Sequence, residues 1–174
     1  MSQLLPAGKV TELVALLEDI EEIKELKARY FRVLDARDWR AFRALFVDEC
    51  TFESGGSRPI HGPDSFVRRV QELIHPGTSV HHGHMPEITI TGADTAQGVW
   101  SMLDYVEVDP DERGRRGVVG LGHYYDEFVR TGEGWRISSW ALRRTRVVRI
   151  ADGGQLLLSA TSAHTAPGVP TRQE

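Results

Sequence analysis

Apolar residues recur at helical spacing through the first part of the chain. From about Val10 to Asp35 they stand three or four positions apart, at Leu13, Leu16, Leu17, Ile20, Ile23, Leu26, Tyr30 and Leu34. Because such spacing lines one face of a helix, the pattern predicts one long amphipathic helix. Acidic residues crowd its earlier half and basic residues, Lys24 and Lys27 among them, its later half, as the helix dipole favours. We interpret these charges as a solvated face.

The helical pattern breaks at Asp38, and two shorter helices are expected beyond it. Asp38 is a good N-cap for a second helix. That helix would carry an apolar stripe of Trp39, Phe42, Leu45 and Phe46. A short strand at 50–53 and a Ser-Gly-Gly-Ser turn at 54–57 follow, and a third helix is predicted from Pro63 or Asp64 to about Ile74.

Beyond Thr78 the pattern changes to alternation with period two, which is typical of strands. Four strands are predicted, at 80–91, 96–108, 118–129 and 135–150. Their connections are short and rich in Gly, Asp and Pro, so they suit hairpins. Helices followed by a long antiparallel meander indicate an α+β domain in which a strongly curved sheet wraps against helices. Such a sheet forms a cone with an apolar pocket.

The chain length fits one domain. A chain of 174 residues with 40% hydrophobic content can bury one good core. We expect a flexible N-terminus at 1–9, the domain at 10–150, and a C-terminal tail at 151–174 that is rich in Gly, Ser, Thr, Ala and Pro. We find no internal repeat.

Charge is mixed along the chain, with 21 basic and 25 acidic residues and a net charge of -4. No overall field attracts the protein to nucleic acid or to an anionic membrane, so neither is expected as a partner. Two basic runs do occur, at 113–116 and 143–149. We interpret them as outward residues of strands and turns, with an anionic tail on a ligand as the weaker alternative.

Cys50 is the single cysteine, so no internal disulfide can form, and its context favours a buried apolar thiol. The first residues lack the basic and apolar regions of a secretion signal, and no apolar run approaches the ~18 residues of a membrane span. We therefore expect a soluble, cytoplasmic protein.

Three histidines occur within four residues at the start of the first long strand. Alternation sends His81 to one face and His82 and His84 to the other. A zinc site would need a third ligand, which no Cys or HExxH motif supplies, so no metal is expected. A structural role fits His84 best. General acid or base catalysis fits the other two better, since an imidazole can take and return a proton near neutrality.

Other polar residues stand in apolar surroundings. Asp104 shares a strand face with Trp100, Met102 and Val106, and His123 shares one with Val119, Leu121 and Tyr125. A buried carboxylate needs a partner, and an imidazole is the obvious one. The pocket that we expect would collect Tyr30, Asp35, His81, Asp104 and His123. It would hold proton donors and acceptors without a cofactor, which fits dehydration, hydration, isomerisation or cyclisation of a hydrophobic substrate.

Four segments, at 26–35, 81–88, 100–105 and 122–127, together resemble the SnoaL-like branch of the nuclear-transport-factor-2-like superfamily. Within it the chain resembles the bile acid 7α-dehydratases and, more distantly, the scytalone dehydratases. The resemblance implies a cone-shaped, cystatin-like α+β barrel with an antiparallel or mixed sheet, cofactor-free elimination beside a carbonyl, and assembly as a trimer or dimer.

The resemblance also implies roles for individual residues. Tyr30 is similar to the phenol that binds the substrate oxygen, Asp35 to the helix carboxylate, and His81 to the catalytic base and acid. Asp104 is similar to a carboxylate that pairs with this histidine, and His123 to a second histidine. The chain departs from the family pattern at Phe52, Glu53 and Leu103, so its pocket lining differs and the resemblance does not identify its substrate.

These features lead to three hypotheses, of which the first is preferred. The first is a lyase in which His81, oriented by Asp35 or Asp104, removes a proton beside a carbonyl while Tyr30 or His123 assists. The second is a module of the same fold that binds a small hydrophobic molecule, or assembles with partners, without catalysis. The third is an isomerase or cyclase that uses the same pocket without loss of water.

Overall fold

The computed structural model describes residues 6–74, 77–107, 115–151 and 156–157. In chain order its elements are α1 (Ala7–Asp35), α2 (Trp39–Arg43), β1 (Phe46–Ser54), β2 (Ile60–His61), α3 (Pro63–Ile74), β3 (Ser79–Gly92), β4 (Thr95–Glu107), β5 (Arg115–Thr131), β6 (Gly134–Ala151) and β7 (Leu156–Leu157). The protein is thus an α+β fold, as the change from helical to alternating periodicity predicts.

The strands form one mixed sheet in the order β2-β1-β6-β5-β4-β3, with β7 added beside β6. The strands β3, β4, β5 and β6 pair antiparallel through hairpins, whereas β1 runs parallel to β6. Along this path β2 and β3 are the two ends, so the described part of the sheet is open. The mixed sheet packed against helices confirms the α+β fold that the sequence predicts.

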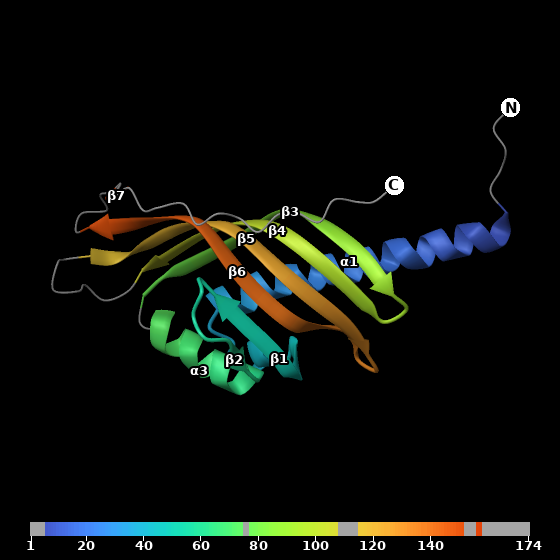
Figure 1. Ribbon diagram of the computed structural model, residues 1–174, viewed down its shortest axis with the longest axis horizontal. Coiled ribbons are helices and arrows are strands. Elements are labelled where there is room, and N and C mark those ends of the chain that lie inside the picture. Colours follow the sequence, from blue (N-terminus) through green and yellow to red (C-terminus); the bar gives the residue numbers. More distant parts are fainter. Residues whose placement is uncertain (1–5, 75–76, 108–114, 152–155, 158–174) are drawn as a thin grey trace, which may run out of the picture.

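Helices cover one face of this sheet. Figure 1 shows α1 running along that face and α3 lying near the end formed by β1 and β2. Between these helices and the sheet lies an aromatic core in which Phe52 stacks on Phe66 with ring centroids 3.9 Å apart. Tyr30 contacts Phe42 and Tyr124 in the same core. The α1 helix is thereby fixed against the sheet by its C-terminal half.

The N-terminal half of α1 lies beyond the sheet (Figure 1). The helix begins at Ala7, slightly earlier than expected, and Val10, Leu13 and Leu17 are exposed. The helical spacing of apolar residues predicts the helix correctly there, but no described part of the sheet covers these side chains.

The second helix is shorter than predicted. It is capped by Asp38, whose carboxylate accepts a hydrogen bond from the Ala41 amide, as expected. It ends at Arg43, because the Leu45 carbonyl accepts a hydrogen bond from the Ile137 amide and the chain joins β6. Phe46 is consequently the first residue of β1 rather than a helical residue.

Lys27 corrects the interpretation of the helix charges as a solvated face. Its side chain is buried, and its Nζ lies 2.5 Å from Oδ2 of Asp126 on β5. The ammonium group also lies 3.9 Å from the centre of the Tyr124 ring. Burial lowers the pKa of Lys27 and raises that of Asp126, and in each case the partner opposes the shift.

Most of the expected C-terminal tail, and Arg113 of the first basic run, lie outside the described residues. Within the described part of the chain, no helix is both long enough and apolar enough to span a bilayer.

Candidate active site

A cavity of about 500 Å³ lies between the helices and the sheet. Apolar side chains form most of its wall, among them Leu34, Phe52, Phe66, Val106 and Trp140. Four of the five residues proposed from the sequence lie at or directly behind its wall. These are Tyr30, His81 and Asp104, which contact the cavity directly, and Asp35, which binds His81 from behind.

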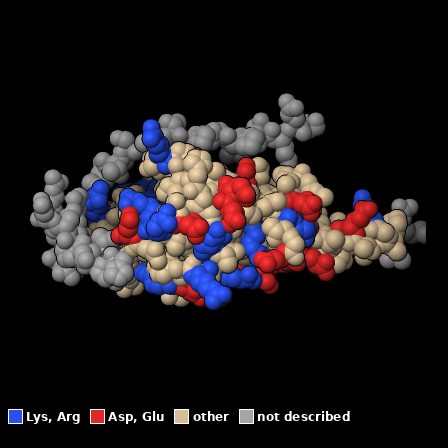
Figure 2. Space-filling model, turned by 90° about the horizontal axis from the view of Figure 1, so that it is seen from below, with Lys and Arg blue, Asp and Glu red and all other residues tan. Residues whose placement is uncertain are grey.

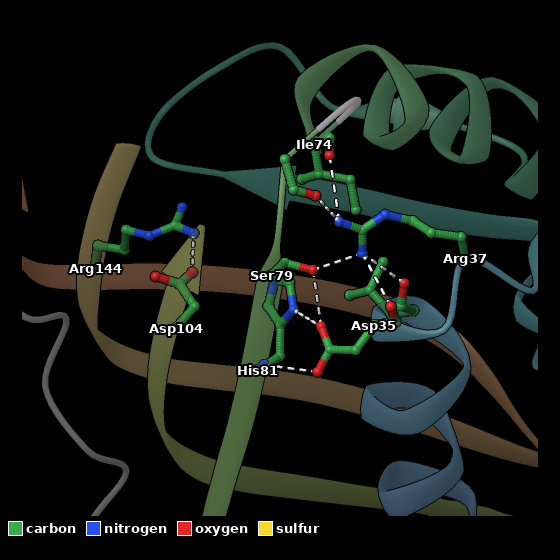
Figure 3. Close-up of polar contacts among 9 residues, drawn as sticks. Asp35, Arg37, Ile74, Ser79, His81, Asp104 and Arg144 are labelled. Atoms are coloured by element: carbon green, nitrogen blue, oxygen red, sulfur yellow. Dashed lines mark hydrogen bonds and ion pairs between the residues drawn. The ribbon is translucent and has the colours of Figure 1, made fainter. Parts of the chain in front are cut away.

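His81 and Asp35 form a tightly bound pair (Figure 3). The Nδ1 atom of His81 lies 2.7 Å from Oδ1 of Asp35. The backbone amide of His81 also donates to Oδ2 of Asp35 over 2.9 Å. Asp35 is the last residue of α1 and His81 lies near the start of β3, so the docking of helix on sheet creates this contact.

The hydrogen bonds favour ionised Asp35. Partial burial would raise the pKa of this carboxyl, but hydrogen bonds from His81 and Ser79 outweigh that effect and lower it below its usual value. An ionised Asp35 must accept at Oδ1, so Nδ1 of His81 carries the proton and Nε2 holds the free lone pair. The pair can therefore work as a general base on the cavity side.

Arg37 supports this pair, a role that the sequence analysis does not predict. Its guanidinium donates to the hydroxyl of Ser79 over 2.7 Å, and that hydroxyl donates to Oδ1 of Asp35 over 2.9 Å. The Arg37 guanidinium also donates to the carbonyls of Leu34, Asp35, Ile74 and Gly77. Figure 3 shows the guanidinium between the end of α1 and the start of β3. One side chain thus joins α1, α3 and β3 behind the histidine.

The backbone of Arg37 is unusual. Its φ of 61° is in the left-handed region, and it is the one residue other than glycine with a positive φ among those that the structure describes. This conformation reverses the chain after α1 and turns the side chain back toward Ser79. The available signal was the helix break in Asp-Ala-Arg-Asp, which does not reveal the partners.

Tyr30 is a buried hydrogen-bond donor in the cavity wall. Only 2% of it is exposed, and it lies against Phe31, Phe42 and Phe46. Burial raises the pKa of the phenol well above its ordinary value; Tyr124 and Asp126 add to this shift, whereas Trp140 and Arg144 oppose it. The phenol therefore stays protonated and can donate to a substrate oxygen but cannot serve as a base.

Asp104 does not pair with His81, which corrects one of the two partners proposed from the sequence. The two residues are opposite each other on β3 and β4, yet the Asp104 carboxylate binds the guanidinium of Arg144 on β6 (Figure 3). This Arg144 reaches into the cavity, so it is not an outward residue of the basic run.

Gly120 on β5 is what allows Asp104 and Arg144 to meet. A Cβ at this position would lie 2.2 Å from Oδ1 of Asp104 and 2.7 Å from Nε of Arg144. Only a residue without a side chain leaves space for an ion pair that crosses from β4 to β6. The buried carboxylate thereby obtains a cation instead of an imidazole.

His123 does not join the other site residues. Neighbours on its strand at 120, 122, 124 and 126 are buried, whereas Leu121 and Tyr125 are exposed on the same face as His123. The imidazole packs near the Tyr125 ring, with centroids 6.3 Å apart, away from the cavity lining. Strand alternation grouped these residues correctly, but that face of the sheet points outward.

The other two histidines of the 81–84 cluster and the cysteine lie as the sequence predicts. His82 and His84 are exposed with their rings stacked 6.4 Å apart, opposite to the side that His81 takes. Cys50 is fully buried, and burial raises its pKa to about 12. Within the described ranges, no three His, Cys, Asp or Glu side chains gather closely enough to hold a metal ion.

Solved structures share this fold. A proposed scytalone dehydratase from Novosphingobium aromaticivorans is 18% identical, with a TM-score of 0.69 over 87% of this chain and 97% of its own. A nuclear-transport-factor-2-like protein with a cystatin-like fold from the same species is 20% identical, with a TM-score of 0.66 over 88% and 94%. A hexachlorocyclohexane dehydrochlorinase from Novosphingobium barchaimii is 17% identical, with a TM-score of 0.69 over 84% and 99%.

At these identities the shared feature is the fold. The sequence itself matches the model of the SnoaL-like domain over residues 15–141, which is most of the chain. That stretch includes both partners of the His81 and Asp35 pair and excludes Arg144. The chain therefore belongs to the family of SnoaL-like domains.

Proposed function

We propose that this protein is a cofactor-independent lyase that removes water from a hydrophobic hydroxy-carbonyl compound by general acid-base catalysis. The observation that carries this proposal is the 2.7 Å contact between His81 and Asp35 at the wall of a largely apolar cavity. A histidine held in one tautomer by a carboxylate is a general base of suitable strength near neutral pH.

In the proposed reaction, Nε2 of His81 takes a proton from the carbon beside the substrate carbonyl. The electrons of that C–H bond form an enolate, whose oxygen accepts a hydrogen bond from the Tyr30 hydroxyl. Collapse of the enolate forms the new carbon–carbon double bond and expels the β-hydroxyl group. The proton held by His81 passes to this leaving oxygen, so that water departs and the imidazole returns to its starting state.

The surroundings support each step. The buried phenol of Tyr30 stays neutral and can donate to the enolate oxygen. Asp35 stays ionised and stabilises the imidazolium that forms on His81. The guanidinium of Arg144, paired with Asp104, adds hydrogen-bond donors to the cavity wall, within a mostly apolar lining that strengthens such interactions.

The structural likenesses add support of a weaker kind. Two of the similar structures are named for elimination reactions, a proposed scytalone dehydratase and a dehydrochlorinase. An elimination needs a base that removes a proton from one carbon and a leaving group on the neighbouring carbon, and the pair of His81 and Asp35 is suited to act as that base.

We also propose, from the sequence, that the protein works in the cytoplasm as a dimer or trimer. Light scattering on the purified protein counts the subunits.

The test is to incubate the protein with steroid-like and polyketide-like β-hydroxy ketones and to weigh the products by mass spectrometry. A dehydratase gives a product lighter by one water. An isomerase or cyclase gives a new compound of unchanged mass. A binding module retains the ligand chemically intact after long incubation. Either of the last two results, across a panel in which some members bind, would overturn the proposal.

A further inference from the structure

Two arginines line the mouth of the cavity, beyond the proposed reaction centre. Arg58 lies in the loop between β1 and β2, and Arg69 lies on α3. Both are exposed, and the cavity wall beside Arg69 continues through the apolar side chains of Val70 and Leu73. Leu73 is 49% exposed although it is a large apolar residue. Apolar wall and positive charge therefore meet at this opening.

These two charges are poorly balanced by the protein. Arg58 has no hydrogen-bond or ion-pair partner among the residues that the structure describes. Arg69 contacts Glu72 at 3.4 Å, with both side chains more than half exposed, and such pairs contribute little. The two acids of the cavity lining are bound elsewhere, Glu53 by Arg143 at 2.9 Å and Asp104 by Arg144. Among the described residues, Arg58 thus lacks a partner and Arg69 has only a weak, exposed one, so both can bind a ligand.

The mouth offers further hydrogen-bond donors. Ser54, the last residue of β1, and Ser57, which directly precedes Arg58, belong to the same lining. In the view of Figure 2, Lys and Arg are more frequent toward the end of the molecule opposite the projecting end of α1, with some Asp and Glu among them. Guanidinium groups recognise carboxylates and phosphates through paired, charge-assisted hydrogen bonds, and hydroxyls can complete such a site.

We propose that the cavity takes an amphipathic anion, whose apolar body fills the cavity and whose carboxylate or phosphate group lies between Arg58 and Arg69. This refines the substrate class of the proposed lyase, since it adds an anionic end to the hydrophobic hydroxy-carbonyl compound. The anion has two possible sources, a carboxylic acid of the substrate itself or the phosphates of an acyl thioester carrier. A binding measurement tests this anion site without any need for turnover.

The test compares two fluorescent probes with the same kind of apolar body. The first, 1-anilinonaphthalene-8-sulfonate, carries an anionic group, and the second, N-phenyl-1-naphthylamine, carries none. The double variant Arg58→Gln and Arg69→Gln should weaken binding of the sulfonate by about tenfold or more and change binding of the neutral probe by less than about twofold. Arg68→Gln, an exposed neighbour on α3 outside the cavity lining, serves as the matched control.

Displacement of the sulfonate probe then separates the two sources. Stronger displacement by laurate indicates a carboxylate end, and stronger displacement by lauroyl-coenzyme A indicates a phosphate end. Three results would overturn the proposed anion site. The double variant could lose both probes equally, it could bind the sulfonate as tightly as the wild type, or the competitors could displace the sulfonate equally well from the wild type and the double variant. Loss of water from a neutral ketone could still be observed in that event, so failure here is distinct from failure of the proposed reaction.

Discussion

His81 and Asp35 are 46 positions apart in the chain, yet Nδ1 of the histidine lies 2.7 Å from Oδ1 of the aspartate. The contact exists because the end of α1 packs against the start of β3. Arg37 and Ser79 hold the two elements together at the same point. The position of the His81 imidazole therefore depends on how exactly α1 docks on β3.

Loss of the Arg37 guanidinium should slow catalysis more than it weakens binding. In Arg37→Asn, Ser79 and Asp35 lose their support, while asparagine still tolerates the left-handed backbone at this position. Misplacement of His81 should lower kcat by roughly 10- to 100-fold with little change in KM. Steady-state kinetics on a substrate from the ketone panel measures this. Arg40→Asn, on the exposed side of α2, is the control, and an equal effect of the two substitutions would count against a positioning role.

Asp35 should make stability depend on acid pH. Its pKa is lowered in the folded protein, so the folded state binds fewer protons here than the unfolded chain. The stabilisation is fully present above the unfolded pKa of about 4 and is lost as pH falls through the folded value. The stability difference between the wild type and Asp35→Asn should thus be constant above about pH 5 and shrink below pH 4. Urea unfolding at a series of pH values measures it, and a difference that stays flat in acid would refute the assignment.

Lys27 should be essential for stability although it lies on a charged helix. Lys27→Met leaves Asp126 buried without a cation, which typically costs about 3–5 kcal/mol. Replacing both partners, as in Lys27→Met with Asp126→Leu, should recover much of that loss. Equilibrium unfolding in urea measures both. Lys24→Met removes an exposed ion pair one turn earlier and should leave stability nearly unchanged. A small loss in the Lys27→Met protein would contradict a buried ion pair.

Gly120→Ala should separate Asp104 from Arg144. The new methyl group would occupy space within 2.7 Å of both charged groups, so the pair must move apart or the strands must shift. Overpacking of this kind costs about 1–3 kcal/mol, which thermal or urea unfolding can measure. Gly132→Ala, whose added Cβ meets nothing within 4 Å, is the control. Equal stability of the two variants would show that Gly120 is not required for the ion pair.

The order of elements was predictable because its signals are local. Alternation and the turns between runs located the four long strands, and Asp38 marked the start of α2. The pairing of Phe46 with β6 was not predictable, since an apolar residue after a short helix looks the same whether the helix continues or a strand begins. Tertiary pairing decided the outcome there.

The site was predictable only in part, for a similar reason. Residue types at Tyr30, Asp35 and His81 indicated acid-base chemistry, but the choice between Asp35 and Asp104 as partner needed the docking of α1. His123 was misplaced because β5 carries apolar residues on both faces, so alternation could not say which face points inward. Lys27 stands at helical spacing from Ile23 and Tyr30 on the buried face, but its partner is 99 positions away and gives no local signal.

The most direct test of the proposed base is the turnover of His81→Ala beside His82→Ala on the best substrate of the panel. His82 is the adjacent imidazole of β3 and points to the opposite, exposed face. We predict that His81→Ala lowers turnover by at least about 10²- to 10⁴-fold, the usual contribution of a general acid-base step, while both variants stay folded and His82→Ala remains close to wild type. Near-wild-type turnover by a folded His81→Ala protein would contradict the account.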